Sequence, residues 1–198
     1  TLPVTLDSPV LAVGGHMKNT LALAWQDRVV VSPHIGDMGS ARSLSVFEKT
    51  LHDLQALYGV KADTLVCDAH PGYATSRWAQ RSGLTLHKVF HHHAHAAAAL
   101  PAEQFMTDSL VFTWDGVGYG EDGTLWGGEA LLGRPGQWQR FASLRPFHLP
   151  GGERAGREPW RSALALCWET GRDWQDRIAP QPLLKQAWQR RVNTPQTT

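Results

Sequence analysis

The amino-acid sequence predicts an α/β protein of two lobes with mixed β-sheets, the second of them incomplete. Over the first half of the chain, short apolar runs alternate with amphipathic segments in the order β-β-β-α-β-α-β-α, which is typical of a mixed sheet with helices on its faces. A new hairpin-rich cycle begins near Ser109, and the sequence ends before that cycle is complete. We therefore expect a linker over residues 1–9, a first α/β lobe over 10–107 and the start of a second, truncated α/β lobe over 108–198.

The first elements form a linker and a meander. Residues Thr1–Pro9 hold two prolines and no apolar period, as expected of a linker. Three short apolar stretches follow, at Val10–Gly14, Thr20–Trp25 and Arg28–Ser32. Because short polar or glycine-rich segments separate them, we expect three antiparallel strands.

Helices and strands then alternate. Apolar residues at helical spacing predict a helix over Leu44–Tyr58, with Ser43 as the N-cap and Gly59 just past its end. Beyond this helix we expect two more strands and two more helices. In chain order they are the strand Thr64–Cys67, the helix Thr75–Ser82, the strand Leu84–Phe90 and the alanine-rich helix His91–Leu100.

The second lobe is expected to begin with another meander. A strand over Ser109–Trp114 leads into a glycine-rich turn over Asp115–Gly123. Further strands are expected at Leu125–Gly133 and Gln139–Ser143, and a helix at Pro159–Gly171.

Composition excludes several classes of protein. The chain of 198 residues is 42% hydrophobic, which is enough for a core and excludes a disordered tail. Lys+Arg 19 against Asp+Glu 18 leaves a net charge of +1, so we expect no nucleic-acid partner. No apolar run is long enough to span a bilayer, and the two cysteines are far apart. We expect a cytoplasmic protein that makes no membrane contact.

Four histidines fall within five positions, and two of them are spaced for metal binding. His91 and His95 are four residues apart on the expected helix, so both imidazoles project from one face and can hold one metal ion. The alternative is a group of histidines that caps or solvates a surface helix. The spacing predicts a metal site, with His92 and His93 pointing elsewhere.

A carboxylate and three glycines suggest a second part of the site. Asp115 follows a predicted strand and can bind a metal or its water shell. Gly116, Gly118 and Gly120 occupy alternate positions, which lets backbone N–H groups approach a phosphate. The alternative is a plain glycine-rich β-turn.

Other candidate residues lie in loops. In the first hairpin, Lys18 can offer a point charge to a phosphate and His16 can accept a proton, although such residues are often simply solvated. Arg157 belongs to a glycine- and arginine-rich segment suited to binding an anion, or to an exposed connector. Asp68 ends a strand, where a turn or cap and a functional role are equally expected. Cys67 is expected to be a buried structural thiol.

Six segments occur in an order and spacing that resembles the carbamoyltransferase domain of the HypF family of hydrogenase maturation proteins, over about residues 10–170. These segments are Gly14–Thr20, Ser32–Asp37, Asp68–Tyr73, His91–His95, Asp115–Gly120 and Arg157–Arg161. The resemblance implies a pair of actin/Hsp70/sugar-kinase-like lobes. It also implies transfer of a carbamoyl group from ATP-derived carbamoyl-adenylate to the C-terminal cysteine of HypE, for the cyanide ligand of nickel-iron hydrogenase.

The same resemblance implies cofactors and partners. His91, His95 and Asp115 would hold a divalent metal, iron or zinc, and Asp115–Gly120 would face the phosphates of the nucleotide substrate. The expected partner is a HypE-like acceptor protein. The incomplete second lobe would leave a sheet edge and apolar surface exposed, which predicts self-association or a need for a partner. Two alternatives stay open: a relative of the enzyme that threonylcarbamoylates tRNA, and a non-catalytic metal-binding or scaffolding fragment that a partner chain completes.

Overall fold

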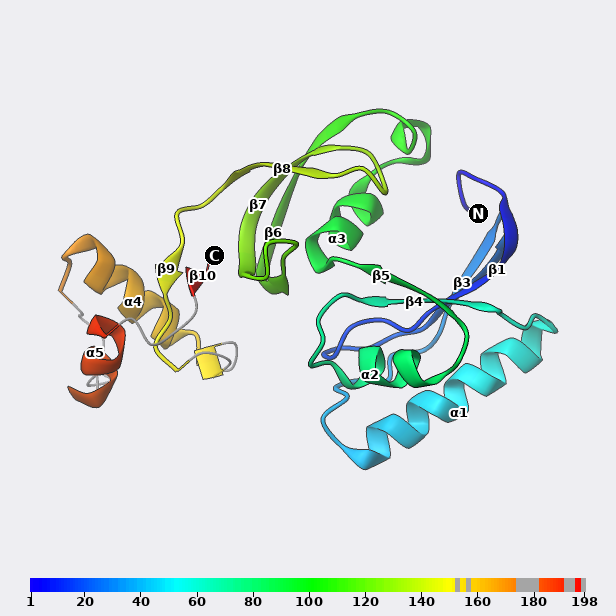
Figure 1. The fold of residues 1–198 in the computed structure, drawn as a ribbon, viewed down its shortest axis with the longest axis horizontal. Coiled ribbons are helices and arrows are strands. Elements are labelled where there is room, and N and C mark those ends of the chain that lie inside the picture. Colours follow the sequence, from blue (N-terminus) through cyan, green and yellow to red (C-terminus); the bar gives the residue numbers. More distant parts are fainter. Residues whose placement is uncertain (152–153, 156–157, 174–181, 191–194, 197–198) are drawn as a thin grey trace. The chain divides into compact units, whose positions relative to one another are not determined.

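The computed structural model describes residues 1–151, 154–155, 158–173, 182–190 and 195–196 (Figure 1). The chain divides into two compact units, Thr1–Thr107 and Asp108–Thr198. Each unit has its own five-stranded sheet. The predicted α/β class with a mixed sheet is confirmed.

The first unit is built on a sheet with the strand order β3-β2-β1-β4-β5. The strands are β1 (Leu6–Ala12), β2 (Ala22–Gln26), β3 (Arg28–Val31), β4 (Thr64–Asp68) and β5 (Thr85–Val89). The first three form the expected antiparallel meander, whereas β1, β4 and β5 run parallel to one another. Parallel strands need a crossover between them, which α1 and α2 provide here.

The first strand begins earlier than expected. Leu6 pairs with Gln26, so residues 6–9 belong to β1 and the prediction of a linker over all of residues 1–9 is wrong for that part. The register between β1 and β2 shifts between Leu6 and Val10, and Pro9 lies within this irregularity. A bulge tolerates proline because the missing N–H is not needed in the ladder there, which is why proline did not exclude a strand.

Helix α1 (Ala41–Tyr58) packs on this sheet through Phe47, Leu51 and Leu54. It begins three residues before the predicted start, because the Ser40 hydroxyl rather than Ser43 is the N-cap and accepts the Ser43 N–H at 3.1 Å. The helix ends at Gly59, whose positive φ suits a C-cap.

Two shorter helices and a 3₁₀ turn complete the first unit. Helix α2 (Ala74–Arg81) follows β4, and helix α3 (His91–Ala99) starts two residues after β5 ends. The 3₁₀ helix η1 (Ala102–Gln104) comes next. In the part of the chain that the structure describes, no helix is both long enough and apolar enough to cross a bilayer.

The second unit is built on a sheet with the order β6-β7-β10-β9, and β8 also pairs with β7. Its strands are β6 (Ser109–Tyr119), β7 (Leu125–Gly133), β8 (Gln139–Ser143), β9 (Phe147–His148) and β10 (Pro195–Gln196). Helix α4 (Trp160–Thr170) and helix α5 (Pro182–Gln189) follow β9. The helix α4 lies within the range that the sequence predicts.

The turn between β6 and β7 is shorter than expected. Strand β6 continues through Asp115 to Tyr119, so the prediction of a turn over Asp115–Gly123 is wrong in its first half. Residues 115–117 form a bulge between the paired positions Trp114 and Gly118. The reversal itself is closed by Gly120, whose N–H donates to the Thr124 carbonyl at 2.9 Å.

An ion-pair network around the buried Glu129 joins β7, β8 and this reversal. Arg140 donates to both carboxylate oxygens of Glu129, at 2.7 and 3.1 Å, and to Asp122 at 3.2 Å. The Glu129 side chain is fully buried. Burial raises the pKa of Asp122, but hydrogen bonds from Thr124 and Trp126 and the Arg140 charge lower it more, so this pKa lies below its ordinary value.

Candidate metal centre

The candidate site forms where two parallel strands end side by side. Strand β4 ends at Asp68, which pairs with Val89, the last residue of β5. Helix α3 begins two residues later at His91, with no side-chain cap at its N-terminus. The sheet therefore brings Asp68 and His91 together although they are 23 residues apart in the chain.

The His91 imidazole is held by the Asp68 carboxylate. Nδ1 of His91 lies 2.8 Å from Oδ2 of Asp68. The other carboxylate oxygen, Oδ1, accepts the backbone N–H of His70 at 2.8 Å. The Asp68 side chain is only 6% exposed and that of His91 27% exposed, so the imidazole is fixed from its inner side and its Nε2 remains on the outer side.

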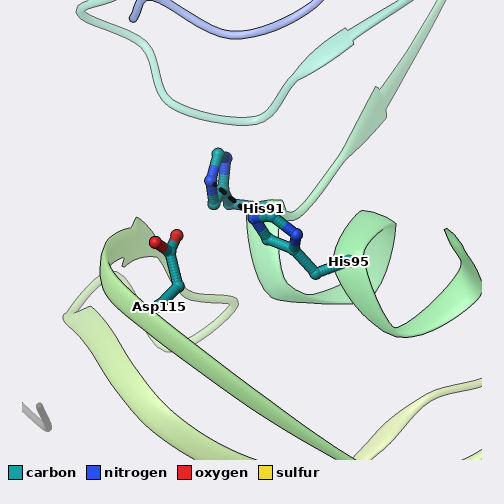
Figure 2. A group of neighbouring side chains, drawn as sticks. All are labelled: His91, His95 and Asp115. Carbon is teal, nitrogen blue, oxygen red and sulfur yellow. Dashed lines mark hydrogen bonds between the residues drawn. The ribbon is translucent and has the colours of Figure 1, made fainter. Parts of the chain in front are cut away.

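The two predicted metal ligands converge through their Nε2 atoms. Nε2 of His91 lies 3.2 Å from Nε2 of His95, as the dashed line in Figure 2 shows. Two nitrogens bound to one cation at about 2.0–2.1 Å lie about 2.8–3.4 Å apart in octahedral or tetrahedral geometry. The pair therefore fits a shared divalent metal ion with little movement of either ring.

The neighbouring histidines do not join this pair. His92 is completely buried, on another face of α3 from the exposed His95. The ring of His93 packs edge-on against Phe90, with ring centroids 5.4 Å apart. The helical spacing thus brings His91 and His95 together and directs His92 and His93 away from them.

A cavity of about 330 Å³ lies beside the histidine pair, within the first unit. Asp68, His91 and His95 form part of its wall. The rest of its wall is formed by small or apolar residues, including Ala12, Gly14, Gly15, Cys67, Ala94 and Ala98. Alanine at positions 94 and 98 leaves space on the same face of α3 that carries the histidines, because these positions are i+3 and i+7 from His91. A small group can therefore enter next to the pair.

The loop after β1 is shaped by Asn19. The buried Asn19 amide donates to the carbonyls of Val13 and Gly15, at 2.9 and 2.8 Å. Gly14 has φ 67° and no room for a Cβ, which would meet Asn19 and the Thr20 carbonyl. This constraint keeps the backbone of Gly14 and Gly15 at the cavity wall.

His16, the predicted proton acceptor, and Lys18, the predicted phosphate contact, lie in this loop but not in the cavity wall. His16 stacks on Tyr73, with centroids 5.5 Å apart, and Tyr73 stacks in turn on His70 at 4.2 Å. Nδ1 of His16 is buried and has no hydrogen-bond partner among the described residues. Lys18 is exposed, and its backbone N–H donates to Asp37 at 3.0 Å.

The predicted residues of the second unit lie on β6 and beyond it. Asp115, also drawn in Figure 2, is half-buried in the β6 bulge, and its Oδ1 accepts the Gly116 N–H at 2.7 Å. Gly118 is paired with Trp126, and a Cβ at Gly120 would collide with the Trp126 ring. Gly118 and Gly120 therefore have packing roles in the hairpin.

One predicted ligand-binding residue, Arg157, lies outside the described residues. The end of the same segment is described: Arg161 is buried and donates to Glu158 at 2.7 Å. The guanidinium of Arg161 also lies over the Trp160 ring, 4.7 Å from its centroid. Arg161 is thus part of the packing of α4.

Cys67 is a buried thiol, as expected. Burial raises its pKa, and the hydrogen bond with Ser76 and the charge of Lys88 offset this only in part. The thiol therefore stays protonated at neutral pH and is a poor nucleophile, although it lies at the cavity wall.

Family models match both halves of the chain. A model described as the HypF Kae1-like domain matches residues 5–102. A model described as the second subdomain of the carbamoyltransferase Kae1-like domain matches residues 111–198.

Curated proteins that are similar to the chain include carbamoyltransferases HypF and HypF2. The chain is 44% identical to carbamoyltransferase HypF of Synechocystis sp. over 171 residues, which cover 86% of this chain and 22% of that protein. It is 37% identical to carbamoyltransferase HypF2 of Cupriavidus necator over 195 residues, covering 94% of this chain and 24% of that protein. The chain thus spans about a quarter of the length of these relatives.

Solved structures of HypF proteins have folds similar to that of this chain. The fold is similar to a crystal structure of full-length HypF in the phosphate- and nucleotide-bound form, with a TM-score of 0.87 and 26% identity, covering 100% of this chain and 27% of that one. It is also similar to the crystal structure of T. kodakarensis HypF, with a TM-score of 0.73 and 29% identity, covering 84% of this chain and 23% of that one.

Proposed function

The chain belongs to the HypF family of carbamoyltransferases, and from this premise we propose that it carries the site at which a carbamoyl group passes from ATP-derived carbamoyl-adenylate to the C-terminal cysteine of a HypE-like acceptor protein. The product would supply the cyanide ligand of a nickel-iron hydrogenase. The observation that carries the proposal is the pair of converging imidazoles, His91 and His95, beside a cavity that admits a small group.

We propose that His91, His95 and Asp115 hold a divalent metal, iron or zinc. The 3.2 Å between the two Nε2 atoms supports the first two ligands. The hydrogen bond from Gly116 orients the Asp115 carboxylate, which supports it as a ligand from the second unit. When bound, such a cation polarises a carbonyl or phosphate oxygen as a Lewis acid. Imidazole and carboxylate donors suit iron and zinc alike.

The transfer itself is a substitution at the carbamoyl carbon. The sulfur of the acceptor cysteine forms a bond to that carbon, the bond from the carbon to the phosphate oxygen breaks, and AMP leaves with the electron pair. The thiol proton needs an acceptor, and we propose His16, which follows Gly14 and Gly15 of the cavity wall in the loop after β1. The nearby Lys18 is exposed and would attract the phosphate of the donor.

The donor phosphates are proposed to contact the second unit. Gly116 is exposed in the β6 bulge, where the ladder is interrupted and where no Cβ would keep a phosphate at a distance. Gly118 and Gly120 are buried in the hairpin and would act by holding the shape of this bulge, and Arg157 would add a positive charge.

A second candidate function is a metal-binding or scaffolding role. The converging pair His91 and His95 would suit a chain that binds a metal and works together with a partner chain. This role needs the histidine pair but does not need carbamoyl transfer by the chain alone.

A transfer assay separates the two functions. Purified chain is mixed with preformed carbamoyl-adenylate and the acceptor protein, and the acceptor cysteine is examined by mass spectrometry for one added carbamoyl group. We expect transfer by the wild type, loss of transfer in His95→Ala, and wild-type transfer in His52→Ala, which removes an exposed histidine of α1. Metal binding without any transfer by the wild type would favour the scaffolding role.

A further inference from the structure

The carboxylate of Asp68 lies behind one of the two proposed metal ligands. Its Oδ2 is 2.8 Å from Nδ1 of His91, on the side of the ring opposite to the nitrogen that faces His95. We propose that Asp68 is a positioning residue that keeps His91 in the Nδ1–H tautomer, so that Nε2 presents its lone pair to the cation. The inference rests on the proposed metal site and adds a residue to it.

The carboxylate is held in place by its surroundings. Its Oδ1 accepts the N–H of His70 at 2.8 Å, and only 6% of its side chain is exposed. The Asp68 carbonyl accepts the Ser76 hydroxyl at 2.8 Å, and the following N–H, of Ala69, donates to the Val89 carbonyl at 2.9 Å. Both the side chain and the backbone of Asp68 are therefore fixed relative to the start of α3.

The chemistry of imidazole makes this contact selective. A neutral imidazole carries one proton, on either Nδ1 or Nε2, and the nitrogen without the proton is the one that binds a metal. A carboxylate can only accept, so a hydrogen bond to Asp68 requires the proton on Nδ1 of His91. Nε2 is then the acceptor, 3.2 Å from Nε2 of His95, where a shared cation fits. Carboxylates that orient metal-binding histidines in this way typically change metal affinity 10- to 100-fold.

The experiment measures metal affinity and the tautomer separately. Co²⁺ affinity is determined by competition with a chromophoric chelator for the full chain, Asp68→Asn, His91→Ala and the control Asp63→Asn. Asp63 is an exposed aspartate just before β4, at the opposite end of that strand from Asp68. The tautomer of His91 is read from the imidazole ¹⁵N shifts of the metal-free protein at about pH 8, where an ordinary histidine is neutral.

We expect Asp68→Asn to bind Co²⁺ about 10- to 100-fold more weakly while still reaching one equivalent, and Asp63→Asn to bind like the wild type. In the metal-free wild type we expect the proton of His91 on Nδ1, and in Asp68→Asn a shift toward Nε2, because the asparagine amide can donate to Nδ1.

Wild-type Co²⁺ affinity in Asp68→Asn, together with loss of binding in His91→Ala, would overturn the role of Asp68 and leave the metal site standing. Wild-type affinity in His91→Ala would overturn the metal site itself. If Asp68→Asn does not fold, the wild-type spectrum decides alone, since a proton on Nε2 of His91 refutes the proposal.

Discussion

The partly exposed Arg140 neutralises the buried carboxylate of Glu129, so removing its charge should destabilise the fold. The Glu129 side chain is fully buried, and Arg140 donates to both of its carboxylate oxygens at 2.7 and 3.1 Å. Arg140→Met keeps much of the apolar stem but removes these donors, so it leaves a carboxylate without its positive charge in a dry environment. We expect the variant to lower the free energy of unfolding by about 3–5 kcal/mol, as for other broken buried pairs.

Urea unfolding followed by circular dichroism and tryptophan fluorescence measures this change. The guanidinium of Arg140 lies over the Trp126 ring, 4.5 Å from its centroid, so Trp126 is one of the nine tryptophans whose fluorescence follows the unfolding. The double variant Glu129→Gln/Arg140→Met removes both charges and should recover more than half of the lost stability. A loss below about 1 kcal/mol in Arg140→Met would contradict this, because it would show that the pair contributes no more than an exposed salt bridge.

Three further predictions concern other parts of the chain. Because burial raises the pKa of Cys67, we expect iodoacetamide to alkylate it more slowly at neutral pH than the half-buried Cys167, and equal rates would contradict this. Because the pKa of Asp122 is lower in the folded than in the unfolded state, its carboxylate stabilises the fold above about pH 4 and loses this effect as the pH falls through the folded-state pKa. The difference in melting temperature between wild type and Asp122→Asn should therefore shrink on acidification, and a constant difference would argue against the shift. Phe112 and Trp114 are 59% and 72% exposed on one face of β6, so we expect concentration-dependent self-association by light scattering that Phe112→Ser reduces; a wild-type monomer at all concentrations would contradict it.

Local patterns in the sequence predicted most of the first unit. The helical spacing of Phe47, Leu51 and Leu54 is what packs α1 on the sheet. The errors arose where pairing with a distant strand overrides a local signal. Pro9 suggests a linker, but a bulge accommodates it within β1. The glycines after Asp115 suggest a turn, but pairing with β7 keeps the chain extended to Tyr119.

The sequence predicted only those parts of the site that depend on local spacing. The pair His91 and His95 follows from a spacing of four residues on one helix, which needs no knowledge of the fold. The role of Asp68 does not, because its contact with His91 exists only if β4 and β5 are neighbours in the sheet. The buried amide of Asn19, which shapes the loop after β1, gives no local signal either.

The strand order explains why these separate segments meet at one place. Strands β1, β4 and β5 are neighbours and run parallel, so their carboxyl ends lie along one edge of the sheet. The chain leaves that edge at Gly14–Gly15 after β1, at Asp68 after β4 and at His91 after β5, and all three segments form the wall of the same cavity. Ligands of open α/β sheets bind at such edges. A sequence that places glycines, a carboxylate and a histidine directly after three such strands therefore predicts one site once the strand order is known.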